Sequence, residues 1–422
     1  MSPLSTCARL AGHARCAVAI QKVLVAAEEL VDWSARFHKN GVAKTTLAMD
    51  WAALMQFKKT FTEPVPEQNA KAYAEAGIDA FRASVRFIDP STLRVGEQTV
   101  SARHVVIAAG AKPREFSFPG ADLFTTSEAF LDLPSLPPRL VMVGGGYISF
   151  EFAHVAARAG AQVTIIHQGA RPLEQFDADL VARLLAATRA LGITVLLQTA
   201  VTGITQSSGR LTVHIKMHDG AEGAIETDAA VHGAGRVPDI DGLDLEAGNV
   251  SRTDEGITVD EYLQSPSNPA VYAAGDAAAS GGLPLTPVAS LEGEIAAANL
   301  LQPRSRRVTH RGTPSVVFTS PALAAVGMLE SHAREQGVAF RTRTQDTSEW
   351  YSSRRLAAAP SGFKVLIDKR SDLILGAHIL GIGAEELVNA FAMGMQLDLT
   401  ASQLRSVLFA YPTFSSDLSS ML

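Results

Sequence analysis

Residues 141–151 read Val-Met-Val-Gly-Gly-Gly-Tyr-Ile-Ser-Phe-Glu, and this stretch decides the fold. A short apolar strand runs into Gly144 and Gly146, and a helical pattern follows them. Gly144 permits a tight turn, and Gly146 lets the backbone approach a pyrophosphate at the positive end of the helix. Ser149 stands where a glycine or alanine normally packs the helix against the strand. The stretch therefore predicts a dinucleotide-binding strand–turn–helix rather than a plain turn.

Composition limits the class of protein. The 422 residues predict two or three domains, and a hydrophobic content of 47% is ample for buried cores. A net charge of −6, without a basic run or zinc-ligand spacing, argues against a nucleic-acid partner and predicts no metal site. No apolar stretch approaches the ~18 residues of a membrane span, and the N-terminus lacks the apolar region of a signal peptide. We therefore expect a cytoplasmic protein with no membrane partner.

The pattern of apolar residues changes along the chain. Residues 22–39 have the spacing of an amphipathic helix, and residues 79–113 alternate short strands with turns. From residue 140 strands and helices alternate, which is typical of a parallel, doubly wound domain. The segments expected here are strands at 140–143, 163–166, 193–197, 211–217 and 229–233, with helices ending at 158 and spanning 177–191. Beyond Pro303 the pattern indicates a separate C-terminal domain with helices at 329–336 and 384–395.

The end of the second strand bears on nucleotide choice. An acidic residue about 20 positions after the glycines would bind the ribose hydroxyls of NAD, and none is present. His167 stands there instead, followed by Gln168 and Arg171. These three residues either select the 2′-phosphate of NADP or form an ordinary solvated loop. We take NADP as the first choice and NAD as the second.

A second ligand-binding stretch is Val-Tyr-Ala-Ala-Gly-Asp at 271–276. It places the carboxylate of Asp276 directly after a strand, next to Gly275, which allows close backbone approach. Such a carboxylate accepts hydrogen bonds from ligand hydroxyls, and the helix beginning around 285–289 offers free backbone N–H groups. A capped turn without a ligand would show the same pattern.

Five motifs in one order resemble the pyridine nucleotide–disulfide oxidoreductases. The branch containing glutathione reductase, lipoamide dehydrogenase and mercuric reductase is the most similar in appearance, and the resemblance runs from Lys22 to the C-terminus. The motifs are Ile107–Gly110 with Pro113, Gly144–Glu151, Gly235–Pro238, Tyr272–Asp276 and Leu285–Ala289.

The resemblance implies an α/β fold with two doubly wound dinucleotide-binding domains, the first incomplete, and an α+β C-terminal dimerisation domain. It implies an FAD-binding domain in two segments (1–115 and 235–303), an NAD(P)-binding domain (116–234) and a dimerisation domain (304–422). The expected protein is a homodimer that uses FAD and NADP (or NAD) and acts on a small-molecule substrate.

The resemblance also assigns roles to individual residues. Gly144, Gly146 and Ser149 would hold the NAD(P) pyrophosphate, and Tyr147 would cover the nicotinamide pocket beside the flavin. Glu151 would lie near the flavin, paired with a lysine that falls at Gln21 or Lys22. Asp276 would bind the ribityl chain, and the helix start would face the flavin ring. The further cofactor-binding positions are Ala109 (a threonine in the family), Gly110, Gly235, Arg236, Gly275, Thr286, Pro287, Val288 and Ala289.

Two departures from the family concern the N-terminal region. No glycine triplet precedes Gly144, so the family's first FAD pyrophosphate loop has no counterpart. The redox pair C-x4-C would fall near His13 and Val18, whereas Cys7 and Cys16 are separated by eight residues and are out of register. We interpret the abrupt change at Lys22 as a truncated, frame-shifted or mispredicted start.

A third departure lies at the C-terminus, where the family's His-Pro-Thr…Glu becomes Tyr411-Pro-Thr with Ser416 in place of the glutamate. Tyrosine can donate a proton but is a poor base at neutral pH, so Tyr411 does not support a thiol relay with a His–Glu pair. The resemblance to mercuric reductase-like enzymes, which have a tyrosine near this place, is compatible with metal-ion or quinone reduction. Three readings remain open. They are an FAD-dependent NAD(P)H oxidoreductase with Tyr147, Glu151 and Tyr411 as catalytic residues, a non-catalytic nucleotide-binding remnant, and an NAD(P)H oxidase.

Overall fold

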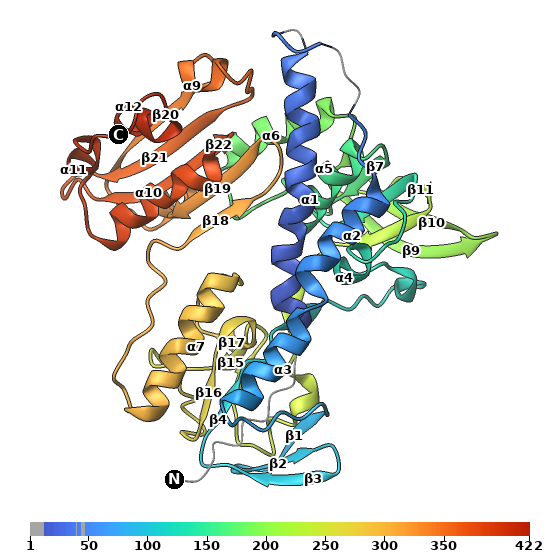
Figure 1. Ribbon diagram of the computed structural model, residues 1–422, viewed down its shortest axis with the longest axis vertical. Helices are drawn as coiled ribbons and strands as arrows, with labels where there is room; N and C mark the ends of the chain where they lie inside the picture. Colours follow the sequence, from blue (N-terminus) through green and yellow to red (C-terminus); the bar gives the residue numbers. More distant parts are fainter. Residues whose placement is uncertain (1–11, 39, 44–46) are drawn as a thin grey trace. The chain divides into compact units, whose positions relative to one another are not determined.

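The computed structural model in Figure 1 describes residues 12–38, 40–43 and 47–422, with side chains from Lys22 onward. The chain forms two compact units. Unit 1 contains residues 56–114 and 236–310 together with residues 12–21 of the described chain. Unit 2 contains residues 22–55, 115–235 and 311–422. Cys7 lies outside the described residues, and only the backbone of Cys16 is described, so the structure does not test the cysteine pair.

The helices of the described chain differ widely in length. They are α1 (Gly12–Phe37), α2 (Trp51–Thr62), α3 (Val65–Glu75), α4 (Ser127–Phe130), α5 (Tyr147–Arg158), α6 (Ala178–Ala190), α7 (Thr286–Leu301), α8 (Glu330–Glu335), α9 (Tyr351–Arg354), α10 (Ala384–Gln396), α11 (Ala401–Arg405) and α12 (Leu418–Met421). The helix expected at 22–39 is confirmed as part of α1, which begins ten residues earlier, at Gly12. Among the described helices, none is both long and apolar enough to cross a membrane.

Unit 1 contains several small sheets and two clusters of buried apolar side chains. Its strands are β1 (Val85–Asp89), β2 (Thr92–Val95), β3 (Gln98–Ser101), β4 (Val105–Ile107), β5 (Ala111–Pro113), β13 (Arg236–Pro238), β14 (Arg252–Thr253), β15 (Gly256–Thr258), β16 (Val271–Ala273) and β17 (Ala278–Ala279). The first three form an antiparallel meander, and β4 pairs in parallel with β16. That parallel pair brings residues 105–107 beside residues 271–273, so the two segments of the expected FAD domain share a core.

The part of unit 2 that is expected to bind NAD(P) is built on a four-stranded parallel sheet. Its strands, in spatial order, are β12 (Ala229–His232), β6 (Arg139–Val143), β7 (Gln162–Ile166) and β8 (Thr194–Leu196). The side chains of β6 after Arg139 are all apolar and buried, as expected for a strand covered on both faces. The expected strand–helix alternation from 140 to 197 is confirmed, with boundaries that differ by one or two residues.

The strand expected at 211–217 does not belong to that parallel sheet. It is β10 (Arg210–Met217), the centre of an antiparallel sheet with β9 (Thr199–Ser207) and β11 (Glu222–Thr227). Buried and less buried side chains alternate along β10, because only one of its faces meets the core. Ser208 and Gly209 both have positive φ, which gives the tight hairpin turn between β9 and β10 the correct twist.

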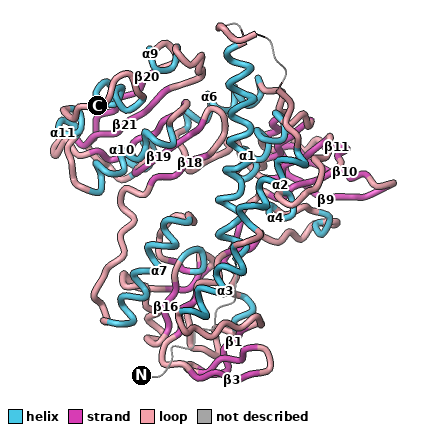
Figure 2. The backbone as a smooth tube through the Cα atoms, viewed as in Figure 1, coloured by secondary structure: helices cyan, strands magenta, loops and turns pink. Residues whose placement is uncertain are grey.

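The C-terminal part of unit 2 is a five-stranded antiparallel sheet covered by α10 (Figures 1 and 2). The strands, in spatial order, are β18 (Pro314–Val317), β19 (Ala322–Gly327), β22 (Ile374–Gly381), β21 (Gly362–Asp368) and β20 (Phe340–Asp346). Val388 and Phe391 of α10 are fully buried and pack with Val365 and Ile379 of the sheet. The expected helices at 329–336 and 384–395 are confirmed as α8 and α10.

Candidate functional site

The glycine turn after β6 has a shape that only glycine fits. Gly144 has φ +117°, and a Cβ at this position would overlap the carbonyl oxygen of Gly233. Its N–H donates to the carbonyl oxygen of Ile166 at 2.8 Å, which fixes the turn against the end of β7. Gly146 is the N-cap of α5, and a Cβ there would contact only Gly233 O, at 3.7 Å. The N-terminus of α5 therefore has the open, positive backbone surface that a pyrophosphate requires.

Ser149 lies beneath this turn. Its side chain is 1% exposed and packs against the backbone of Gly233, where a Cβ would overlap the serine hydroxyl. The hydroxyl has no hydrogen-bond partner among the described residues. Ser149 thus provides the close helix–strand packing expected of the third small residue in the motif.

The packing of Ser149 can be tested by changing the size of its side chain. We expect Ser149→Val to lower the free energy of unfolding by about 1–3 kcal/mol, because the added methyl groups have no space beside Gly233. Ser149→Ala should not lower it, because the hydroxyl makes no hydrogen bond that alanine would lose. Urea unfolding of both variants measures the difference. Equal losses would contradict the packing argument.

The expected nucleotide-selecting residues form a compact loop. The ring of His167 lies against Gly145, and its Nε2 is 3.0 Å from the carbonyl oxygen of Arg171. The Arg171 guanidinium donates to the carbonyl oxygens of Phe176 (2.8 Å) and Glu174 (3.0 Å). Gln168 is exposed. Two of the three residues therefore hold the loop itself, and selection of a 2′-phosphate stays a prediction.

A buried ion pair lies further along α5. Glu151 is 1% exposed, and its Oε2 accepts a hydrogen bond from Lys22 Nζ at 3.0 Å. Its Oε1 accepts the backbone N–H of Phe318 at 2.8 Å, and Lys22 Nζ also lies 3.5 Å from the centre of the Phe318 ring. Of the two positions considered for the lysine, Lys22 is the partner. Burial lowers the pKa of Lys22, while the carboxylates of Glu151 and Glu28 oppose that shift.

Tyr147 is the first residue of α5 and is half-buried. It lies four residues before Glu151, so the two side chains project from the same face of the helix. The glycine turn therefore leads directly into the helix that carries Tyr147 and Glu151, whereas Lys22 comes from α1 and Tyr411 lies near the C-terminus. The start of α5 thus positions the expected nucleotide ligands relative to two of the three expected catalytic residues.

Unit 1 contains the turn expected to bind the ribityl chain. Gly275 has φ +66°, and its N–H donates to Glu292 Oε2 at 2.7 Å. Burial raises the pKa of Asp276, with Glu292 adding to the shift and Arg236 opposing it. Thr286 and Pro287 are exposed at the start of α7, Val288 is buried, and Ala289 packs against Gly275. The turn and the positive end of α7 thus lie together.

The remaining expected residues lie around β5 and β13. Gly110, with φ +73°, precedes β5, and its carbonyl oxygen accepts the N–H of Asp239 at 2.9 Å. The guanidinium of Arg236 donates to the carbonyl oxygen of Ala111. Ala109 packs on the core of unit 1, whereas Gly235 is an exposed residue at the end of a unit 2 segment.

Glu292 is the residue of this site that the motifs did not reveal. It is 1% exposed, and its Oε1 accepts hydrogen bonds from Ser280 Oγ at 2.6 Å and from His310 Nε2 at 2.8 Å. Together with the bond from Gly275, these contacts hold the Asp276 turn on α7. The sequence of α7 did not distinguish this residue, because the helix carries a second carboxylate, Glu294, two residues further along.

We expect Glu292→Ala to lower the free energy of unfolding by about 2–4 kcal/mol, because it removes hydrogen bonds to a buried charged group and leaves the Gly275 N–H without a partner. Glu294→Ala, at an exposed position two residues further along α7, is the matched control and should have little effect. Urea unfolding of the two variants measures both values. Equal stability of the two variants would show that Glu292 does not hold the turn.

The C-terminal tyrosine is exposed. The side chain of Tyr411 is 78% accessible, and its ring stacks on Tyr351 with centroids 6.3 Å apart. Ser416, which replaces the family's glutamate, forms a capping box with Thr413 through two hydrogen bonds of 3.1 and 3.2 Å. This serine has a local structural role, so Tyr411 does not receive a carboxylate partner from that position.

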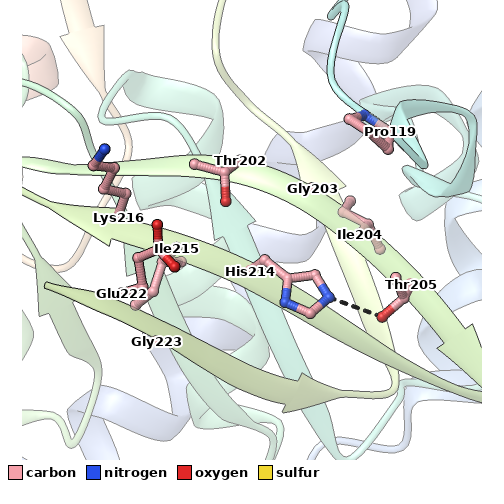
Figure 3. A pocket seen from close by; sticks show the side chains of 10 residues that line it. All are labelled: Pro119, Thr202, Gly203, Ile204, Thr205, His214, Ile215, Lys216, Glu222 and Gly223. Carbon is pink, nitrogen blue, oxygen red and sulfur yellow. Dashed lines mark hydrogen bonds between the residues drawn. The ribbon is translucent and has the colours of Figure 1, made fainter. Parts of the chain in front are cut away.

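A pocket lies elsewhere in unit 2, on the sheet of β9, β10 and β11 (Figure 3). His214 and Thr205 face each other in it, joined by a hydrogen bond of 2.9 Å, and Lys216 and Glu222 also line it. None of the expected site residues lines this pocket. Among the described residues, no cluster of three or more His, Cys, Asp or Glu side chains could hold a metal ion.

Comparisons with known proteins identify the family of this chain. The family model described as pyridine nucleotide-disulphide oxidoreductase matches residues 25–293, and that of the family's dimerisation domain matches residues 313–422. The chain is 31% identical to a glutathione reductase of Burkholderia cepacia over 376 residues, covering 87% of this chain and 80% of that protein. It is 28% identical to a mercuric reductase of Staphylococcus aureus, covering 90% of this chain and 69% of that protein.

A shorter relative and a solved structure extend the comparison. A protein of Staphylococcus aureus described as an uncharacterized 19.7 kDa protein in a mercuric resistance operon is 45% identical over 180 residues, which is 43% of this chain and 100% of that protein. The HOCl-induced flavoprotein disulfide reductase RclA from Escherichia coli superposes with a TM-score of 0.82 at 25% identity, covering 95% of this chain and 88% of that one. The chain therefore belongs to the pyridine nucleotide-disulphide oxidoreductase family and has the α/β flavoprotein fold of that family with its dimerisation domain.

Proposed function

We propose that the protein is an FAD-dependent NAD(P)H oxidoreductase that transfers hydride from nicotinamide to flavin. The observation that carries this proposal is the order of groups on α5: the glycine turn at its start, then Tyr147, then Glu151 paired with Lys22. Family membership supports a flavin-dependent oxidoreductase in general, and this helix supplies the groups for a nicotinamide substrate. FAD, when bound, supplies the hydride-accepting ring.

The chain's own residues have distinct roles in this proposal. Gly144 and Gly146 bind the pyrophosphate of the nucleotide through backbone N–H groups. Tyr147 covers the nicotinamide pocket, and the Lys22–Glu151 pair holds fixed charges in a site with little water. In unit 1, Asp276 would accept hydrogen bonds from the ribityl hydroxyls of FAD, and the positive end of α7 would stabilise negative charge on a bound flavin.

Some, but not all, of the residues expected to bind FAD are present in this chain. The Asp276 turn, its support by Glu292 and the uncovered helix start fit the group, whereas no glycine triplet precedes Gly144. We therefore expect FAD to bind with micromolar affinity, corresponding to about −8 kcal/mol. Absorbance titration with FAD measures this value. Asp276→Ala should weaken binding at least tenfold, and Asp254→Ala, at an exposed loop position of the same unit, should not.

For the nucleotide, we propose NADPH as the preferred donor and NADH as the second. Support comes from the missing acidic residue after β7, because a carboxylate there would repel a 2′-phosphate. Dissociation constants for both nucleotides, measured for the wild type and for Gln168→Glu, test the preference. The introduced carboxylate is expected to shift the ratio towards NADH, and an unchanged ratio would place the selecting group elsewhere.

The terminal acceptor is proposed to be a small molecule that takes electrons at the flavin, such as a quinone or a metal ion. The substitutions of the family's C-terminal histidine by Tyr411 and of its glutamate by Ser416 support this, because a thiol relay needs a base. Steady-state assays with a quinone, mercuric ion and glutathione disulfide distinguish the acceptors. Efficient reduction of glutathione disulfide would contradict the proposal.

We also propose that the protein acts as a homodimer through its C-terminal domain. Large apolar side chains are exposed there, among them Met393, Leu397 and Leu408. Apolar side chains of this size are typical of surfaces that a partner covers. The molar mass in solution, measured by light scattering for the wild type and for Leu397→Glu, tests whether this surface joins two copies.

A further inference from the structure

A carboxylic acid lies buried beside the Lys22–Glu151 pair without a full set of partners. Glu28 lies on α1, six residues after Lys22, and is 0% exposed. Its Oε1 accepts a hydrogen bond from Arg158 Nη1 at 2.7 Å. Its Oε2 has no hydrogen-bond partner among the described residues. An ionised oxygen in this position would be costly, because burial removes water and nothing replaces it.

The arginine that contacts Glu28 is shared with a better-satisfied carboxylate. Arg158 Nη2 donates to Asp32 Oδ1 at 3.0 Å and to the carbonyl oxygen of Ser320 at 3.1 Å. Asp32 Oδ2 accepts two more hydrogen bonds, from Arg36 Nε (2.8 Å) and Ser320 Oγ (2.9 Å). Of the two acids that share one guanidinium, Asp32 therefore has the fuller set of hydrogen-bond donors.

The neighbouring histidine adds no positive charge. The Thr188 hydroxyl donates to the carbonyl oxygen of Leu184 at 2.9 Å, so it accepts the hydrogen bond from His154 Nε2, also at 2.9 Å. The other ring nitrogen, Nδ1, faces the N–H of Ser320 and the Arg158 guanidinium, both at 3.4 Å. His154 is thus neutral with its proton on Nε2, and burial together with Arg158 lowers its pKa well below the ordinary value.

The contacts around Glu28 favour its neutral form. Lys22 pairs with Glu151, and Arg36 and Arg158 both contact Asp32. Glu28 has only a share of Arg158, through Oε1, and its Oε2 has no hydrogen-bond donor among the described residues. We propose that Glu28 carries a proton on Oε2 at neutral pH, and that its ionisation in mildly alkaline solution slows hydride transfer by adding a buried negative charge beside the Lys22–Glu151 pair. The first half of this proposal concerns the protein alone, and the second half rests on the proposed function.

The direction of the pKa shift agrees with the geometry. Burial raises the pKa of Glu28 from its ordinary 4.5 to about 8, with Asp32, Glu29 and Glu151 adding to the shift and Arg158 opposing it. Between these values the folded protein holds a proton that the unfolded chain has lost. The stabilising contribution of this proton is therefore fully present below pH 4.5 and is lost as the pH rises through about 8.

Whether Glu28 carries a proton is tested first, in protein without cofactors, by comparing the wild type with Glu28→Gln. The amide has the shape of the protonated acid but cannot ionise. The free energy of unfolding of the wild type is expected to fall more steeply with pH from about 5 to 8 than that of the variant. Glu29→Gln, which removes the exposed neighbouring carboxyl, is the control and should keep most of the wild-type slope.

Carbon NMR of glutamate-labelled protein gives the same answer without unfolding. One carboxyl signal should titrate in mildly alkaline solution in the wild type and in Glu29→Gln, and should be missing from Glu28→Gln. Equal unfolding slopes in the wild type and Glu28→Gln, or no such signal, would show that Glu28 is ionised throughout and would overturn the proposal.

The second half of the proposal is a coupling between the ionisation of Glu28 and hydride transfer. It is tested with FAD-loaded protein by measuring the rate of flavin reduction by NADPH as a function of pH. The wild-type rate is expected to fall at least threefold as the pH rises past about 8, and the Glu28→Gln rate to change less than half as much. Identical profiles would overturn the coupling while leaving the proton assignment intact. If neither protein is reduced at any pH, the proposed function fails and the coupling with it, whereas the cofactor-free measurements still decide the proton.

Discussion

Replacing Lys364 by methionine is expected to lower the free energy of unfolding by about 3–5 kcal/mol. Lys364 lies on β21 with its side chain 6% exposed, and its Nζ pairs with Asp177 Oδ2 (2.8 Å), Asp179 Oδ2 (2.6 Å) and Glu330 Oε2 (3.0 Å). The side chain of Asp177 is 4% exposed, so removing the ammonium leaves a buried carboxylate without its counter-ion. Hydrogen bonds to the three carboxylates raise the pKa of Lys364 despite its burial.

Two further variants separate this charge effect from lost packing. Asp177→Asn in the Lys364→Met background should recover part of the loss, because asparagine keeps the N-cap of α6 and removes the unpaired charge. Arg334→Gln removes another cation from Glu330, but Arg334 is largely exposed and the loss should be small. Urea unfolding of the four proteins tests this. A loss below about 1 kcal/mol for Lys364→Met would contradict the account of a buried cluster.

The second large effect is expected at the glycine turn. Gly144→Ala should destabilise the protein by about 3 kcal/mol or more and weaken binding of NADPH at least tenfold. Alanine at φ +117° is strained, and its Cβ would overlap the carbonyl oxygen of Gly233, so the turn must move away from the end of β12. That movement displaces the backbone N–H groups at the start of α5 from the position of the pyrophosphate.

Gly160→Ala is the matched control for this effect. Gly160 also has positive φ, +97°, but a Cβ there would have nothing within 4 Å. It should cost only the backbone strain, about 1–3 kcal/mol, and leave the dissociation constant for NADPH unchanged. Unfolding and fluorescence titration with NADPH measure both quantities. Equal effects of the two substitutions on NADPH binding would show that the glycine turn does not hold the nucleotide.

The sequence predicted the strand–turn–helix unit well and the neighbouring antiparallel sheet poorly. The strand β6 is a continuous apolar run that ends in glycines, so its type and its boundary are both visible in the sequence. The strands β9 and β11 expose one face, and Thr199–Ser207 contains mainly small and polar residues. Pairing with β10 across hairpin turns stabilises them, and that contribution does not appear in the apolar pattern of a single strand.

The residues of the candidate site also include some that the sequence predicted and some that only the structure revealed. Gly144 and Asp276 were predicted from local motifs, because each follows the end of a strand, whereas Tyr147 and Glu151 were assigned by the resemblance to the family. Glu28 and Arg158 are 130 residues apart and meet only when α1 packs against α5. The motif order could not reveal such a contact. The resemblance did predict that Glu151 has a lysine partner, but folding was needed to choose Lys22.

The most direct test of the proposed hydride transfer is the visible absorption spectrum of the FAD-loaded protein during anaerobic addition of NADPH. The account predicts a bound flavin band that bleaches in proportion to added nucleotide, and slower bleaching in Gly144→Ala. Such a result would confirm that electrons pass from nicotinamide to flavin in this chain. A protein that takes up no FAD, or binds FAD that neither NADPH nor NADH reduces, would contradict it.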